Sequence, residues 1–212
     1  METVLTTKRI LIFNVSIMGV LILAALVAPG PFTALLTRPE FYLHAKFIHI
    51  VSVTLFFANT VIGTLWEVRS LYSGRAVIIE HTYQTVRWLD AVFTAPLIIC
   101  GVVSGIMLGT ILGGIWSMGW LSLAFLLFLL SGLVWLVADL PSQHQVKRLF
   151  ELMPPGSERL TPELTRLLWR RMGINFLGFA PLLVIFFLMV HKPELPALST
   201  WLKSKSFGSG KP

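Results

Sequence analysis

The chain has 212 residues, of which 55% are hydrophobic and only 13% are charged, and its mean hydropathy is +0.79. Because about a quarter of the residues in a soluble domain are charged, this composition excludes a water-soluble enzyme and a disordered chain. The 17 lysines and arginines outnumber the ten acids. They lie between apolar runs, which indicates a membrane topology and not nucleic-acid binding. The single cysteine, Cys100, excludes an intrachain disulfide and a thiolate metal cluster.

Five apolar runs reach or approach the roughly 20 residues that a helix needs to cross the hydrocarbon core of a bilayer. They cover residues 10–28, 45–66, 88–110, 116–138 and 172–190. The first run also follows two basic residues, as a signal peptide does, but its apolar part is too long and no clear cleavage site follows it. We therefore expect a retained helix there. The predicted fold class is an all-α membrane protein, a single domain (residues 1–212) in which five transmembrane helices form a bundle.

A polar segment, residues 141–171, separates the fourth span from the fifth. Pro154, Pro155 and Gly156 interrupt it, and Thr161 before Pro162 is typical of a helix start. This pattern predicts a helical hairpin. Placing the N-terminus in the cytoplasm puts eleven of the 17 basic residues on the inner side, as the positive-inside rule favours. We thus expect a bacterial inner-membrane protein with a cytoplasmic N-terminus and hairpin, an outer C-terminus, and a flexible tail at residues 203–212.

The second predicted span carries a polar stripe. Its members follow one another at three- and four-residue steps, so they share one helical face: Lys46, His49, Ser52, Phe56, Asn59 and Gly63. Polar groups are costly in hydrocarbon unless they face a cavity or another helix, so this face should point inward. His49 then either forms a hydrogen bond with a neighbouring helix or ligates a metal or haem iron.

Other histidines could complete such a centre. His191 ends the fifth span on the same predicted outer side, and His44 lies in the approach to the second span. Either could be the opposite axial ligand. His81 and His144 fall on the predicted cytoplasmic side, which excludes them from a centre at His49.

The third span begins with Arg87 and Asp90, which are three residues apart and can pair on one face. An ion-paired anchor is the favoured interpretation of Asp90, and a proton-relay carboxylate is the alternative. Further along, glycines recur every four residues and predict a groove for close helix packing, within the chain in preference to a dimer: Gly101, Gly105 and Gly109.

Four short segments carry a resemblance: residues 46–50, residues 89–96, Ser104-Gly105 and residues 189–193. Together they resemble a bacterial family of predicted integral-membrane proteins of unknown function, over about residues 41–193. The Lys-x-x-His helix at Lys46 and His49 is also similar to a helix in membrane-bound haem-dependent protoporphyrinogen oxidases and in copper-resistance membrane proteins of the D type. In those oxidases the helix histidine is taken to ligate haem, which implies an axial-ligand role for His49. The fifth span and the hairpin depart from the oxidase pattern, so the resemblance does not extend to the oxidase reaction.

The leading hypothesis is an electron-transfer protein, an oxidoreductase or its subunit, that binds b-type haem and meets a membrane redox partner. In it His49 and His191 are the iron ligands, Lys46 lies beside a propionate, and Ser52 and Asn59 line the pocket. Two alternatives stay open. A transporter or metal-permeation protein would use the stripe as a polar pathway, whereas an assembly subunit would bind a larger membrane complex, or a second copy, through the glycine groove and the hairpin.

Overall fold

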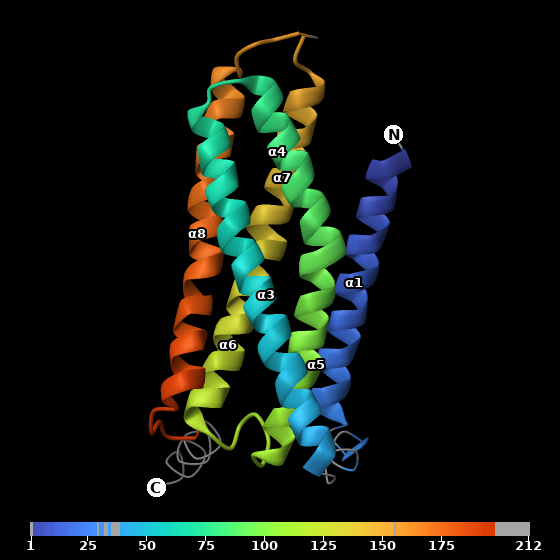
Figure 1. Cartoon of the computed structure of the whole chain (residues 1–212), viewed down its shortest axis with the longest axis vertical. Helices are drawn as coiled ribbons and strands as arrows, with labels where there is room; N and C mark the ends of the chain where they lie inside the picture. Colours follow the sequence, from blue (N-terminus) through green and yellow to red (C-terminus); the bar gives the residue numbers. More distant parts are fainter. Residues whose placement is uncertain (1, 29, 32–33, 35–38, 155, 198–212) are drawn as a thin grey trace, which may run out of the picture.

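The computed structural model describes residues 2–28, 30–31, 34, 39–154 and 156–197, and all regular secondary structure in these residues is helical. The long helices lie side by side along one axis (Figure 1). In chain order they are α1 (Glu2–Val27), α3 (Pro39–Tyr72), α4 (Ala76–Leu89), α5 (Ala95–Ile111), α6 (Gly119–Val134), α7 (Leu140–Glu151) and α8 (Pro162–His191). Two five-residue π-helices, η1 (Asp90–Thr94) and η2 (Trp135–Asp139), join α4 to α5 and α6 to α7.

Four continuous helical stretches are long and apolar enough to cross a membrane: Glu40–Tyr72, Ala76–Ile111, Gly119–Glu151 and Pro162–His191. At 1.5 Å per residue they measure about 45 to 54 Å, which exceeds the thickness of a bilayer core. The second, third and fifth predicted spans fall inside them, whereas the fourth, at 116–138, begins three residues before Gly119. The first predicted span coincides with α1, whose apolar stretch is shorter, Ile12–Ala24. The start of α1 and the end of α8 lie at opposite ends of the bundle (Figure 1).

The predicted hairpin at residues 141–171 does not form a separate unit. Its first half, α7, continues the helix of α6 through η2, and its second half is the beginning of α8, which runs on into the fifth predicted span. The predicted spans end where the apolar residues end, whereas a helix ends only where its backbone hydrogen bonding stops. The predicted helix start is confirmed, since the Thr161 side chain accepts a hydrogen bond from the Leu164 backbone N–H at 3.3 Å. The tail at residues 203–212 lies outside the described residues.

A proline follows each π-helix by two residues: Pro96 after η1 and Pro141 after η2. Proline has no N–H, and in an α-helix its ring clashes with the carbonyl four residues earlier. The π turn widens the helix just before the proline, with the Ala95 N–H bonded to the Asp90 carbonyl and the Leu140 N–H bonded to the Trp135 carbonyl. Each helix therefore passes its proline and continues.

The two ends of the bundle expose different kinds of side chain. In the polar end, which comprises residues 67–89 and 140–171, an apolar core lies inside: Leu71, Ile79, Tyr83, Val146, Leu164, Leu167 and Leu168, extended by Met172. Its outside carries polar residues such as Glu80, His81 and Arg148. In the apolar half, which comprises residues 39–66, 90–139 and 172–191, large apolar residues face outward, as with Phe47, Ile62, Leu133 and Phe187.

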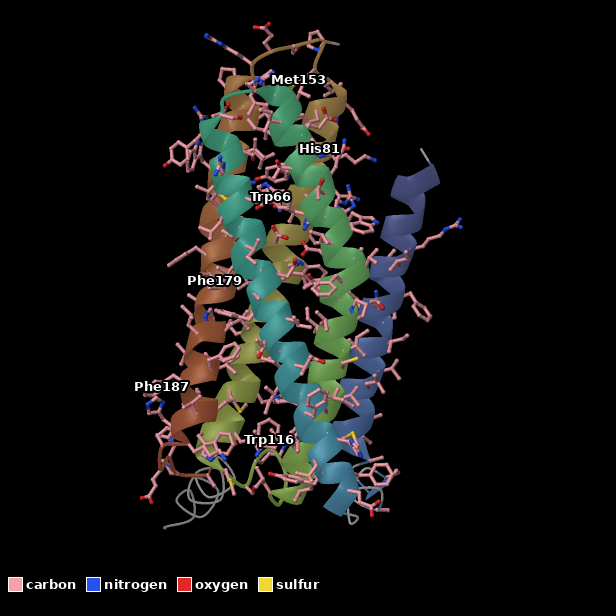
Figure 2. The ribbon with its side chains drawn as sticks, in the orientation of Figure 1. Trp66, His81, Trp116, Met153, Phe179 and Phe187 are labelled. Carbon is pink, nitrogen blue, oxygen red and sulfur yellow. The ribbon has the colours of Figure 1, made fainter. Side chains whose placement is uncertain are left out.

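The apolar half has the dimensions of a bilayer core. Along α3 its apolar run extends from Ala45 to Trp66, a rise of about 32 Å at 1.5 Å per residue. Trp66 and Trp116, both exposed, lie at different heights (Figure 2), as aromatic residues do at the two membrane interfaces. The chain is therefore an integral membrane protein with several apolar helices, and its polar end lies beyond the apolar layer.

Candidate functional site

Three charged side chains are buried where the polar end meets the apolar half. Glu67 of α3 is 3% exposed, Asp139 at the end of η2 is 6% exposed, and Arg171 of α8 is 4% exposed. The Arg171 guanidinium forms an ion pair with Asp139, with 2.9 Å between Nη2 and Oδ1. On the next turn of α8, Asn175 Nδ2 donates to Glu67 Oε2 at 3.1 Å. These contacts tie α3, η2 and α8 together around buried charge.

A second set of hydrogen bonds leads from η1 into the apolar half. Asn59 Nδ2 of α3 donates to Thr94 Oγ1 at 2.7 Å, and the Thr94 hydroxyl donates to Asp90 Oδ1 at 3.2 Å. The predicted ion pair between Arg87 and Asp90 is absent, since the side-chain ion pairs in the described part of the chain are Arg171 with Asp139 and Lys147 with Glu151. Asp90 opens the π turn, so its carboxylate meets the hydroxyl of Thr94, one turn further along.

Two cavities lie on opposite sides of these groups. A lower cavity of about 190 Å³ extends into the apolar half, with Asn59, Phe128 and Phe179 in its wall. An upper cavity of about 200 Å³ lies in the polar end between α4, α7 and α8. Four residues line both: Glu67, Val86, Asp90 and Arg171. In Figure 2, Trp66, the neighbour of Glu67 in sequence, shows the height at which the two cavities meet. Phe179, in the wall of the lower cavity, lies further down the bundle.

The charges at this junction do not balance. We call Glu67, Arg87, Asp90, Asp139 and Arg171 the charged centre; each of them lines at least one of the two cavities. The wall of the upper cavity also includes the exposed Glu80 and the ion pair of Lys147 with Glu151, which lie further into the polar end and are not counted in the centre. The centre comprises three carboxylates and two guanidiniums. A buried charge without a partner is costly, both in protein interiors and at membrane depth. The centre therefore favours one additional positive charge, either a proton or a bound cation.

His49 bonds a neighbouring helix, as in one of the two interpretations of its sequence position. Its Nδ1 donates to the Gly101 carbonyl oxygen of α5 at 2.8 Å. The ring lies against Gly105, where an added Cβ would be only 2.8 Å from His49 Cε1. Ser52, also predicted for the haem pocket, is buried beside Gly101.

The other predicted haem residues are spread over the bundle. His191 is exposed at the end of α8, where its ring stacks on Phe187 at 4.1 Å between centroids. His49, His191 and Lys46 line neither cavity, whereas Asn59 lines the lower one. His81 and His144 are exposed in the polar end. Among the described residues, no group of three or more His, Cys, Asp or Glu side chains could hold a metal ion.

The glycine row packs within the chain, as the sequence favoured. An added Cβ at Gly101 would meet Val53 and Ser52 of α3, and one at Gly105 would meet His49. Gly109 faces residues that follow it in the chain, Ile115 and Leu121. Close approach of α3 and α5 is thus the role of Gly101 and Gly105.

Sequence reasoning missed Glu67, Asp139 and Arg171. Each lies one residue beyond a predicted span, because the boundaries were drawn at residues 66, 138 and 172. A signal was present for Glu67, which follows Gly63 by four residues and extends the stripe of α3.

Comparison with family models matches residues 43–193 to a family described as "Predicted integral membrane protein (DUF2269)". This segment includes the whole charged centre, and α1 lies outside it. Neither the curated proteins nor the solved structures contain a match to the chain. Because the matched segment covers most of the sequence, the chain belongs to this family of predicted integral membrane proteins.

Proposed function

We propose that this protein carries protons or small monovalent cations across a membrane through the charged centre. The observation that supports the proposal is that two cavities, one in the polar end and one in the apolar half, share Glu67, Asp90 and Arg171 in their walls. Ionisable residues at such positions mark ion and proton paths in membrane proteins. The polar stripe of α3 then serves as one wall of the path.

Glu67 is the carboxylate best suited to bind the transported ion. It faces both cavities and has no ion pair within 4.0 Å among the described residues. The amide of Asn175 holds the carboxylate in position from α8. Arg171 would repel a passing cation, but Asp139 compensates its charge at 2.9 Å. Binding at Glu67 supplies the positive charge that the centre lacks.

The orientation follows the distribution of basic residues. With the N-terminus in the cytoplasm, the polar end and its upper cavity face the cytoplasm and the end of α8 faces the outside. A bacterial inner membrane, across which a proton gradient is kept, is the location we propose.

Flux into liposomes tests this function. Purified protein is reconstituted, a membrane potential is imposed with a potassium gradient and an ionophore, and uptake of protons, Na⁺ and K⁺ is measured separately. We expect uptake of one of these ions above that of empty liposomes, and loss of that uptake in Glu67→Gln. The matched control is Glu158→Gln, an exposed glutamate in the loop before α8. Uptake unchanged in Glu67→Gln, or equal to that of empty liposomes in the wild type, would overturn the proposal.

A b-type haem for electron transfer, with His49 and His191 as iron ligands, is the second candidate. One observation favours it: His49 donates through Nδ1 to a carbonyl, which leaves Nε2 available, and histidines that ligate metals commonly have this arrangement. We rank it second because neither cavity reaches His49 or His191. Absorption spectra of protein from haem-sufficient cells decide the matter. A Soret band that His49→Ala weakens would support haem, and colourless protein would exclude it.

A further inference from the structure

Three buried side-chain polar atoms in the described part of the chain have no hydrogen-bond partner: Tyr83 Oη, Ser131 Oγ and Arg171 Nε. All three belong to residues that line the two cavities. Tyr83 lines the upper cavity, Ser131 lines the lower cavity, and Arg171 lines both. Buried polar groups are nearly always satisfied by protein or by ordered water. The unpartnered atoms therefore indicate which spaces hold water.

Both cavities have room for water, and their walls, although mostly apolar, carry polar groups: Tyr83 in the upper one, Asn59 and Ser131 in the lower one. Each volume is well above the roughly 10–15 Å³ that a single water needs, so each has space for several waters. In the upper cavity, the Tyr83 hydroxyl and Arg171 Nε offer donors. A carboxylate can accept about four hydrogen bonds, whereas Glu67 accepts one from Asn175 and Asp90 accepts one from Thr94. Water in this cavity can thus connect Tyr83 to Glu67.

We infer that the two cavities hold connected water on either side of the charged centre, and that the transported ion is the proton. This inference rests on the proposed function and names its substrate. Hydrogen-bonded water carries protons along a chain of donors and acceptors, and the unpartnered atoms lie where such a chain would need anchors. The path enters at Tyr83, passes Glu67 and Asp90, and leaves by Thr94, Asn59 and Ser131.

The chemistry around the carboxylates disfavours a metal cation. Such an ion needs several oxygen atoms directed at it, but the groups that contact these carboxylates are donors. Asn175 donates an N–H to Glu67, the Thr94 hydroxyl donates to Asp90, and Arg171 donates to Asp139. A proton needs only one oxygen atom, which Glu67 can supply.

The transfer takes two balanced steps. A hydronium ion in one cavity loses a proton to the Glu67 carboxylate, so that one O–H bond of the hydronium breaks and a carboxyl O–H forms. The neutral carboxyl group then gives this proton to water in the other cavity and becomes a carboxylate again. No electrons move, and the imposed proton gradient drives the net passage of one proton.

Tyr83→Phe tests the inference because it removes only the hydroxyl. The ring remains over the Arg171 guanidinium, where its centroid lies 5.2 Å from Cζ. In reconstituted liposomes we expect the rate of proton uptake to fall severalfold in Tyr83→Phe and in Ser131→Ala, and wild-type uptake to slow in heavy water. The matched control is Tyr72→Phe, since Tyr72 is exposed at the end of α3, and it should transport as the wild type does.

The outcomes separate this inference from the proposed function. Proton uptake that Glu67→Gln abolishes but Tyr83→Phe and Ser131→Ala leave unchanged would overturn the inference alone. Glu67-dependent uptake of Na⁺ or K⁺ in place of protons would also overturn it alone. No Glu67-dependent uptake of any of the three ions would overturn both. Thermal unfolding of each variant identifies loss of uptake that comes from misfolding, and a misfolded Ser131→Ala is replaced by Ser131→Cys.

Discussion

The polar end and the apolar half are built from the same four long helices, and both bury apolar residues, yet they present opposite kinds of side chain to their surroundings. In the polar end, Ile79, Leu164 and Leu168 are fully buried and the outside is polar, so the hydrophobic effect stabilises it as in a soluble bundle. In the apolar half, the outside is apolar and small residues such as Gly101 and Ala124 are buried. Since lipid removes the hydrophobic drive between helices, packing and hydrogen bonds hold this half together.

The charged centre lies where the two regions meet. In the polar end, water can solvate an ionised group, and in the apolar half nothing outside the bundle can. Asp139 and Arg171 form an ion pair at this boundary, while Glu67 and Asp90 each accept a hydrogen bond from one side-chain donor. The change of surroundings along each helix, more than any single motif, thus creates a site where charged side chains are held together.

The largest expected effect comes from breaking the buried ion pair. Asp139→Asn removes the ion-pair partner of the buried Arg171 guanidinium, and such losses cost about 3–5 kcal/mol. Chemical unfolding in detergent would measure this. Breaking the exposed pair of Lys147 and Glu151 by Glu151→Gln should cost under about 0.5 kcal/mol.

A double variant sharpens that result. Replacing both partners, Asp139→Leu with Arg171→Met, removes the charges together and should recover most of the stability lost in Asp139→Asn. If Asp139→Asn were as stable as the wild type, the buried pair would not be a structural tie between η2 and α8.

The next effect compares the two kinds of packing directly. Leu168→Ala opens a cavity in the core of the polar end, where the side chain is 0% exposed, and should cost about 2–5 kcal/mol. Leu133→Ala in the apolar half, where the side chain is 56% exposed, should change the unfolding free energy by less than about 0.5 kcal/mol, as surface changes do. Equal costs at both positions would contradict the division into two regions.

A smaller effect tests the close approach of α3 and α5. Gly105→Ala places a Cβ 2.8 Å from His49 Cε1 and should cost about 1–3 kcal/mol through displacement of the ring. Gly173→Ala in α8 has nothing within 4 Å and should be neutral or stabilise by up to about 1 kcal/mol. A destabilised Gly173→Ala beside an unaffected Gly105→Ala would show that the two helices do not meet in this way.

The sequence predicted the helical class and the positions of the apolar spans, because a run of about 20 apolar residues has few other interpretations in a membrane protein. It did not predict where the helices end. A charge was taken to end a span at Glu67, Asp139 and Arg171, since ionised groups are costly in hydrocarbon. The fold satisfies Asp139 and Arg171 across helices, and that pairing depends on which helices are neighbours.

Part of the candidate site could be anticipated and part could not. Asp90 was singled out as an intramembrane acid, and Asn59 as a member of the polar stripe, because both stand out against apolar surroundings. That His49 would meet the glycine row of α5 could not be read from either segment alone. The π turns at Asp90 and Asp139 could not be predicted from the sequence either, because a single wider turn shifts the backbone locally but hardly changes the spacing of apolar residues along the chain.

Charge crossing at Glu67 is tested most directly by uptake of protons, Na⁺ and K⁺, each measured separately, into liposomes that contain the wild type, Glu67→Gln or no protein. We expect wild-type uptake of one of these ions to exceed that of empty liposomes, and Glu67→Gln uptake of the same ion to equal it, with the unfolding temperatures of the two proteins within a few degrees of each other. Equal uptake of all three ions by the wild type and Glu67→Gln would contradict a role of Glu67 in the passage of charge.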